Sequence, residues 1–120
     1  FSHTQHFAAV ATSKIHEIGI DMEENHRSVS KIAGRFLNEE ELEILQTEDL
    51  QRLAWCMKEA MYKSFGEKGL DFRKEIEISK QHREFVGHIK FKEKETNFSL
   101  FWSLENRLTI CVAVPNLPTI

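Results

Sequence analysis

The chain has 120 residues, of which 41% are hydrophobic and 29% are charged, and its formal net charge at pH 7 is -3. This length and composition are typical of one soluble globular domain with a single core. The acidic balance gives no reason to expect a nucleic-acid partner, and no apolar run approaches the roughly 18 residues that a membrane-spanning helix needs.

Two neighbouring strands are predicted near the start of the chain, in residues 7–13 and 15–21, which are apolar and rich in β-forming residues. A short break separates them, so we expect a hairpin. Because the chain begins without Met and runs directly into this stretch, we expect that its first residue is not the native start of the polypeptide. Cys56 and Cys111 lie far apart within apolar stretches, which favours two reduced core thiols in a cytoplasmic protein.

About 45 residues of helical character follow. A first helix is indicated by an apolar face of Val29, Ile32, Ala33 and Phe36. Asn38 resembles an N-cap for a short second helix, since three glutamates follow it where the helix dipole favours anions. A third helix is predicted from Glu48 or Asp49 to the residue before Gly66, with apolar side chains at helical spacing: Leu50, Leu53, Ala54, Met57, Ala60, Met61 and Phe65.

The remainder of the chain alternates polar and apolar residues with period two, which predicts strands in residues 74–79, 84–93, 97–105 and 107–114. Turns are predicted at residues 81–82, 95–96 and 105–106. Two strands, a helical segment and an antiparallel β meander in this order predict an α+β fold.

Two carboxylates stand at the end of the second predicted strand, in the sequence GIDMEE. Asp21 and Glu23 lie two residues apart, so an extended chain points both to the same face. Adjacent carboxylates repel one another, and such a pair shares a cation, shares a proton or stays solvated. A solvated strand end is the simpler interpretation. The apolar residues just before Asp21, however, put it at the rim of the core, where hard oxygen ligands suit Mg²⁺.

The third predicted helix mixes charges with apolar residues in WCMKEAMYK, residues 55–63. Glu59 and Lys63 are one turn apart, and a surface ion pair is the simpler interpretation. Lys58 lies about 100° around the helix from Glu59 and could face solvent. Trp55 lies on the same side of the helix as Glu59, so this face is not simply exposed to solvent. A metal and phosphate site would form here if the helix packs beside the strand that carries the carboxylate pair.

Basic residues recur every fourth position along the first predicted helix, at Arg27, Lys31 and Arg35. A solvated helix face is the simpler interpretation. The functional alternative is a docking stripe for an acidic helix of a partner, with nearby apolar contacts from Ile32, Phe36 and Leu37.

Four motifs, taken in order, resemble the 4'-phosphopantetheinyl transferase superfamily. They are an S-H in FSHT, a G-I-D-x-E in IGIDMEE, an F-x-x-x-E in RFLNEEEL and a W-x-x-K-E-A-x-x-K in WCMKEAMYKSFGEKGL, together covering roughly residues 1–70. The sequence is most similar to the surfactin-synthetase-activating type, in which two pseudo-repeated halves share one chain. The resemblance implies transfer of the 4'-phosphopantetheine of coenzyme A to a serine of an apo acyl or peptidyl carrier protein, with release of 3',5'-ADP.

The resemblance also implies a metal site and a catalytic pair. Mg²⁺ would be held against the pyrophosphate by three carboxylates, Asp21, Glu23 and Glu59. Glu59 is in addition the candidate for deprotonating the carrier serine, directly or through water. Lys63 would contact the phosphates, and with Glu59 it forms the expected catalytic pair.

Contacts with the substrates follow from the same resemblance. Coenzyme A would meet Ser2 and His3 near its 3'-phosphate and Lys63 at its other phosphates, and Lys58 belongs to the same motif and is grouped with them. Carrier proteins of this system are acidic, which suits docking near Arg27, Lys31, Arg35 and Phe36.

One part of the family pattern is missing. Relatives of the two-half type carry a comparable preceding half, and none precedes Phe1 here. The single domain of residues 1–120 is therefore expected to be the C-terminal half of a longer protein, inactive on its own, or a relative that must form an oligomer. Two other functions stay open: a non-catalytic carrier-protein or coenzyme A-binding module with the same fold, and an unrelated α+β interaction domain.

Overall fold

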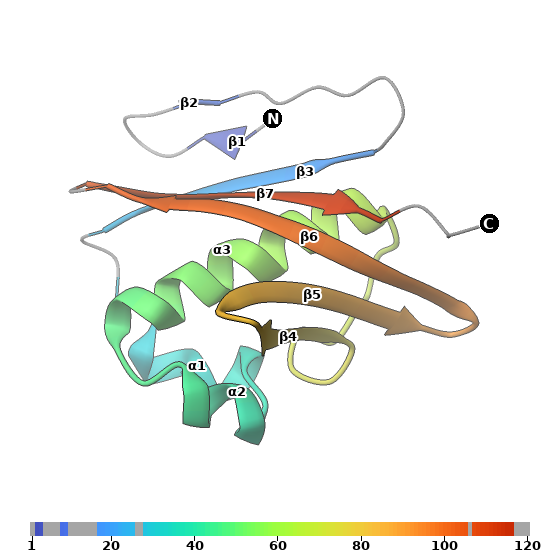
Figure 1. Cartoon of the computed structure of the whole chain (residues 1–120), viewed down its shortest axis with the longest axis horizontal. Helices are drawn as coiled ribbons and strands as arrows, with labels where there is room; N and C mark the ends of the chain where they lie inside the picture. The colour runs from blue at the N-terminus through green and yellow to red at the C-terminus, as the bar shows by residue number, and fades with distance from the viewer. Residues whose placement is uncertain (1, 4–7, 10–16, 26–27, 106, 117–120) are drawn as a thin grey trace.

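A computed structural model of the protein describes residues 2–3, 8–9, 17–25, 28–105 and 107–116. A curved antiparallel sheet and a long helix across one of its faces dominate it (Figure 1). The sheet has five strands in the order β3-β7-β6-β5-β4, with bounds Gly19–Glu24, Leu108–Pro115, Lys94–Leu104, Glu84–Phe91 and Ile76–Gln81. Two short strands, β1 (Ser2–His3) and β2 (Ala8–Ala9), pair with each other, and β1 lies against β3. The predicted α+β class is confirmed.

The helical segment lies between β3 and β4. It consists of a 3-10 turn η1 (Ser30–Ile32) followed by α1 (Ala33–Phe36), α2 (Glu39–Ile44) and α3 (Glu48–Phe65). Asn38 caps α2 as predicted, because its Oδ1 accepts from the Glu41 backbone N–H at 2.8 Å while Glu41 Oε1 accepts from the Asn38 N–H at 2.8 Å. Helix α3 ends at Gly66, whose φ of 78° only glycine adopts without strain.

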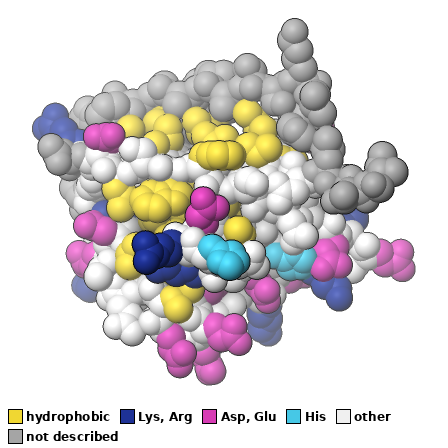
Figure 2. Space-filling view, in the orientation of Figure 1, with side chains coloured by type: hydrophobic (Ala, Val, Ile, Leu, Met, Phe, Trp, Pro, Cys, Tyr) yellow, Lys and Arg dark blue, Asp and Glu magenta, His cyan; other side chains and the backbone are white. Residues whose placement is uncertain are grey.

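The core lies between α3 and the inner face of the sheet. Alternate residues of the strands point to α3 and are buried, namely Ile76, Ile78, Ile89, Phe98, Cys111 and Ala113. On the outer face Ile110 and Val112 are only half-buried and Phe101 is 60% exposed. Figure 2 shows hydrophobic side chains gathered in the upper part of one face, next to the grey residues. One sheet face thus supplies the core, and the other keeps exposed apolar area.

One predicted turn is wrong, and the predicted hairpin lies largely outside the described residues. Strand β3 pairs with β7, so that Asp21 lies opposite Cys111, and Ala8–Ala9 of the predicted first strand pair with β1. Residues 10–16, which include the expected turn of the hairpin, are not among the described residues. The turn between β5 and β6 lies at residues 92–93, where Lys92 has a φ of 57°, and not at residues 95–96. Strand propensity reveals neither a strand's partner nor a turn inside an almost wholly polar stretch.

The first predicted helix is shorter than expected. Val29, Ala33 and Phe36 are buried as the apolar spacing predicts, but Ile32 is 38% exposed. The segment changes from a 3-10 turn to one turn of α-helix at this point, so a continuous helical period does not apply. Within the described ranges, no helix has both the length and the apolar content needed to cross a bilayer.

Candidate active site

Strand β3 and helix α3 approach each other closely at Gly19. A Cβ on Gly19 would lie 1.8 Å from the backbone oxygen of Ala60 and 2.8 Å from the backbone nitrogen of Ser64, distances that no real side chain could adopt. Ala60 is itself fully buried. The Ser64 hydroxyl donates to the Glu17 carbonyl and closes the far end of this contact. The small residues of the G-I-D-x-E and K-E-A motifs therefore bring the two motifs into direct contact.

Because side chains alternate along a strand, Asp21 and Glu23 point the same way as Gly19, toward α3. Each meets a different turn of the helix. Lys63 Nζ donates to Asp21 Oδ1 at 2.9 Å and to the Ile20 carbonyl at 3.1 Å. One α3 residue two turns earlier, Trp55, donates its indole N–H to Glu23 Oε1 at 3.0 Å. The prediction that both carboxylates share one face and meet this helix is confirmed.

Glu59 lies on α3 between Trp55 and Lys63, one turn from each. Burial raises the pKa of its carboxyl above the ordinary value, and the charges of Asp21 and Glu23 raise it further, while Lys63 acts in the opposite direction. The charges of Asp21 and Glu23 on β3 thus act on the Glu59 carboxyl of α3.

The two cysteines, Cys56 on α3 and Cys111 on β7 opposite Asp21, are free, buried thiols. Burial raises the pKa of Cys111 to about 12, and the nearby charge of Asp21 adds to the effect. Burial also raises the pKa of Cys56, again with Asp21 and then Glu23 contributing. Both thiols are thus kept protonated, which agrees with their prediction as reduced core residues.

The donor set of the gap between β3 and α3 suits a hard cation. Among the described residues no three His, Cys, Asp or Glu side chains already stand in the arrangement of a metal site, and the ammonium of Lys63 rests on Asp21. The chemistry nevertheless fits, since Asp21, Glu23 and Glu59 offer the oxygen ligands that Mg²⁺ prefers, and Asp21 already attracts one positive group. Asp21, Glu23 and Glu59 are the residues that could hold such an ion.

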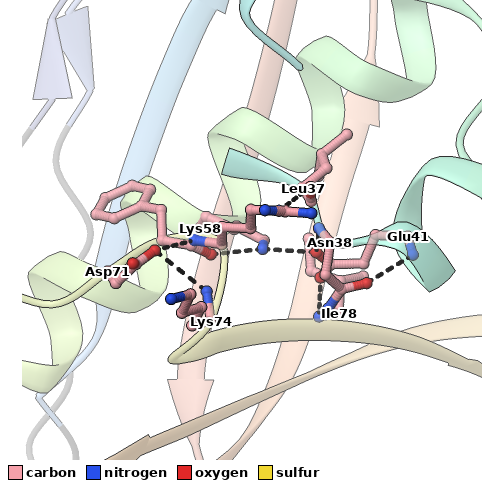
Figure 3. Close-up of polar contacts among 9 residues, drawn as sticks. Leu37, Asn38, Glu41, Lys58, Asp71, Lys74 and Ile78 are labelled. Atoms are coloured by element: carbon pink, nitrogen blue, oxygen red, sulfur yellow. Dashed lines mark hydrogen bonds and ion pairs between the residues drawn. The ribbon is translucent and has the colours of Figure 1, made fainter. Parts of the chain in front are cut away.

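Lys58 corrects the sequence interpretation. Its side chain is 0% exposed, so it could neither face solvent nor contact coenzyme A as grouped above. Lys58 Nζ donates to Glu41 Oε1 at 2.8 Å and to the Phe72 carbonyl at 2.7 Å. Glu41 Oε2 accepts from the Ile78 backbone N–H at 2.7 Å, so this buried pair joins α3 to α2, to β4 and to the loop before β4 (Figure 3).

The structure describes the side chains of some of the other predicted site residues but not of all of them. Ser2 and His3 form β1 beside β3, but their side chains lie outside the described part of the chain, as does Arg27. Lys31 and Arg35 are exposed, as docking requires. Phe36 is 2% exposed and packs edge-on against Trp55, so its expected role as a docking contact is wrong.

Sequence reasoning missed two residues of this region. Glu41, the partner of Lys58, was interpreted only as one of three acidic residues favoured in a first helical turn. Its burial has no local signal, because its partner lies 17 residues further along the chain. Trp55 was placed on the correct side of α3, but the sequence did not indicate that its indole N–H reaches Glu23. Only the packing of β3 on α3 brings these groups together.

A model of the 4'-phosphopantetheinyl transferase superfamily matches residues 17–113, and the chain therefore belongs to this superfamily. The matched range includes β3, α3 and the five-stranded sheet except for the last two residues of β7. It thus contains the two motifs that meet at Gly19 and Ala60. The chain matches no curated protein sequence.

Similar solved structures are holo-acyl-carrier-protein synthases, and at these identities they support the fold alone. The enzyme of Thermotoga maritima has a TM-score of 0.69 and 21% identity over 83% of this chain, which spans 62% of the Thermotoga chain. That of Bacillus anthracis, in complex with CoA (3',5'-ADP), has a TM-score of 0.65 and 24% identity over 82% of this chain and 94% of its own. The enzyme of Plasmodium yoelii has a TM-score of 0.60 and 24% identity, and the match covers 82% of this chain and 92% of the Plasmodium chain.

Proposed function

We propose that the protein is a Mg²⁺-dependent cytoplasmic transferase that moves the 4'-phosphopantetheine of coenzyme A to a serine of an apo carrier protein and releases 3',5'-ADP. The observation that carries this proposal is the meeting of Asp21, Glu23, Glu59 and Lys63 between β3 and α3. Membership in the superfamily and a similar fold that binds coenzyme A in the Bacillus anthracis enzyme support it.

The site residues on β3 and α3 have different roles in the reaction. Asp21, Glu23 and Glu59 would hold the metal, which when bound supplies charge neutralisation at the pyrophosphate oxygens. Lys63, already poised at this gap, binds the phosphates. The serine oxygen attacks the phosphorus that carries pantetheine, the bond from that phosphorus to the bridging oxygen breaks, and 3',5'-ADP leaves. Glu59 accepts the serine proton directly or through a water.

The carrier protein would dock on the segment from η1 to α1. Lys31 and Arg35 are exposed there, and Ile32, at 38% exposure, is the apolar side chain between them that a partner can reach. An acidic helix laid along this segment would pair with both cations and cover Ile32. Ile32 thus takes the place that the buried Phe36 cannot fill.

The test is to incubate the protein with coenzyme A, Mg²⁺ and an apo acyl carrier protein, and to weigh the carrier by mass spectrometry. We expect the mass of one phosphopantetheine to be added. The variant Glu59→Gln should lower the rate at least about a hundredfold, because it loses both a metal ligand and the proton acceptor. The exposed Glu93→Gln is the matched control. A carrier that binds without gaining mass would contradict the transferase and favour a binding module.

A further inference from the structure

Trp55 lies on α3 with Glu59 and Lys63, and the proposed reaction gives it no role. It stands two turns from Lys63 on the same side of the helix, with its indole N–H on Glu23 Oε1 at 3.0 Å. The contact joins α3 to β3 across 32 residues of sequence, so only the tertiary structure makes it. An indole N–H can only donate, and a carboxylate oxygen is the acceptor it finds here.

The indole ring is held in place by other aromatic rings. Phe36, buried in α1, meets it edge-on with centroids 5.1 Å apart and an interplanar angle of 74°. Phe72, in the loop before β4, lies on it at 5.7 Å and also contacts Tyr62 at 5.2 Å. Because Trp55 is flanked by rings from two other segments, the direction of its N–H is fixed before any ligand binds.

The backbone of Phe72, whose ring flanks Trp55, is held in place by a buried charge. The backbone carbonyl of Phe72 accepts from Lys58 Nζ at 2.7 Å, and Lys58 is tied to Glu41 at 2.8 Å. Burial lowers the pKa of Lys58 and the charge of Glu41 acts against this shift, as expected of an ammonium kept only because it has a partner. The conformation of the loop at Phe72 is therefore tied to α2 and α3.

A neutral hydrogen-bond donor is a suitable partner for a carboxylate that binds a metal. Lys63 brings a positive charge to Asp21, whereas the N–H of Trp55 orients Glu23 without cancelling its charge. A carboxylate has about four lone-pair sites, and the hydrogen bond from Trp55 occupies only one of them. The mutual repulsion of Glu23 and Glu59 acts against the Glu23 orientation that this hydrogen bond supports.

We propose that Trp55 is a positioning residue that holds Glu23 in the orientation needed to bind the divalent metal. This rests on the proposed function, which makes Glu23 a metal ligand. Hydrogen-bond partners of metal ligands typically contribute 10- to 100-fold to metal affinity, and a single neutral donor belongs near the lower limit. The positioning role therefore predicts a loss of metal affinity that depends on Glu23.

The experiment compares the wild-type protein with Trp55→Phe, which keeps an aromatic ring but removes the N–H together with the rest of the five-membered ring. Binding of Mn²⁺ is followed by the electron paramagnetic resonance signal of the free ion, with no substrate present. We expect the Kd for Mn²⁺ to rise about tenfold. The Mg²⁺ concentration needed for half-maximal transfer should rise equally, while kcat at saturating Mg²⁺ stays within about twofold of wild type. Trp102→Phe, at an exposed position of β6, is the matched control and should change neither value.

A double-mutant cycle separates positioning from general packing. In the Glu23→Gln background, Trp55→Phe should weaken Mn²⁺ binding by less than about twofold, because the group that it positions is already lost. An unchanged Kd in the single variant, or an equal loss in both backgrounds, would overturn the inference. A wild-type protein that binds no Mn²⁺ would overturn it together with the metal site. A protein that binds Mn²⁺ but modifies no carrier would refute only the proposed function, since the cycle still decides the role of Trp55.

Discussion

Glu59 is a partly buried carboxylate held beside two others, an arrangement that disfavours its charged form. Burial and the charges of Asp21 and Glu23 raise its pKa, and Lys63 only partly opposes them. Keeping three negative groups together thus lowers the stability of the folded protein, as is common at ligand-binding sites. The same residue should therefore be unfavourable for the metal-free fold and necessary for the reaction.

The first prediction concerns the metal-free stability of Glu59→Gln. The folded-state pKa of Glu59 is raised above its ordinary value of 4.5, so the folded protein holds this proton more tightly than the unfolded chain does. The wild type consequently loses stability as pH rises from about 4.5 through the folded-state pKa. At neutral pH without metal, the variant should be more stable than wild type, by less than about 1 kcal/mol because solvent screens the side chain.

Urea unfolding followed by circular dichroism, at neutral pH and at about pH 4, measures this difference. At the lower pH it should become much smaller, because the wild-type carboxyl is then mostly protonated in both states. Added Mg²⁺ should stabilise the wild type and have a smaller effect on the variant. A variant that is less stable than wild type at neutral pH without metal would show that the carboxylate is not repelled there.

At the scale of elements, the site depends on how closely β3 can approach α3. Gly19 and Ala60 set that distance, and the carboxylates Asp21 and Glu23 follow Gly19 along the strand while Glu59 precedes Ala60 by one position on the helix. The atoms that meet a Cβ on Gly19 belong to the helix backbone, which cannot move aside as a flexible side chain would. Any added carbon at this position must separate the two elements.

The second prediction is that Gly19→Ala destabilises the protein by about 3 kcal/mol or more, since overpacking against rigid backbone is at the costly end of such changes. Transfer activity should fall by more than the unfolded fraction explains, because Asp21 and Glu23 move away from α3. Gly34→Ala is the matched control. A Cβ there meets nothing within 4 Å, and alanine in α1 should be neutral or stabilising by up to about 1 kcal/mol. Equal melting temperatures for the two variants would contradict this account.

The elements show what local sequence could and could not predict. The cap at Asn38, the extent of α3 and its end at Gly66 were predicted because their signals lie within a few residues. The side on which Asp21 and Glu23 point followed from strand geometry. The partner of β3 did not, because pairing of β3 with β7 joins segments about 90 residues apart.

Side chains at the site show the same limit. Helical spacing gives the angle between Lys58 and Glu59 around the helix axis but not which part of the protein each side chain contacts. The burial of Lys58 against Glu41 therefore could not be predicted. The apolar face of the first helical segment was predicted, but the same pattern cannot distinguish a buried Phe36 from a docking contact. Family resemblance identified the carboxylates and Lys63 but not the packing that orients them.

For the whole molecule, the distribution of charge matters more than its sum. The net charge of -3 would repel an acidic partner, and α2 carries exposed acidic side chains, Glu39, Glu40 and Glu43. The exposed cations Lys31 and Arg35 lie just before α2 along the chain. The proposed acidic carrier would thus be attracted to one segment and repelled by the next, which would favour one docked orientation.

The third prediction is that the double variant Lys31→Glu and Arg35→Glu raises KM for the acyl carrier protein about tenfold, with KM for coenzyme A within about twofold of wild type. The matched control reverses Lys90 and Lys92, exposed lysines near the β5–β6 turn, at the end of the molecule away from α1 in Figure 1. Steady-state transfer assays at two ionic strengths measure both. Because the Debye length falls from about 10 Å at 0.1 M salt to about 3 Å at 1 M, the effect should be much smaller at the higher concentration. Equal losses in the two double variants would instead indicate a general effect of net charge, and would place the carrier elsewhere on the surface.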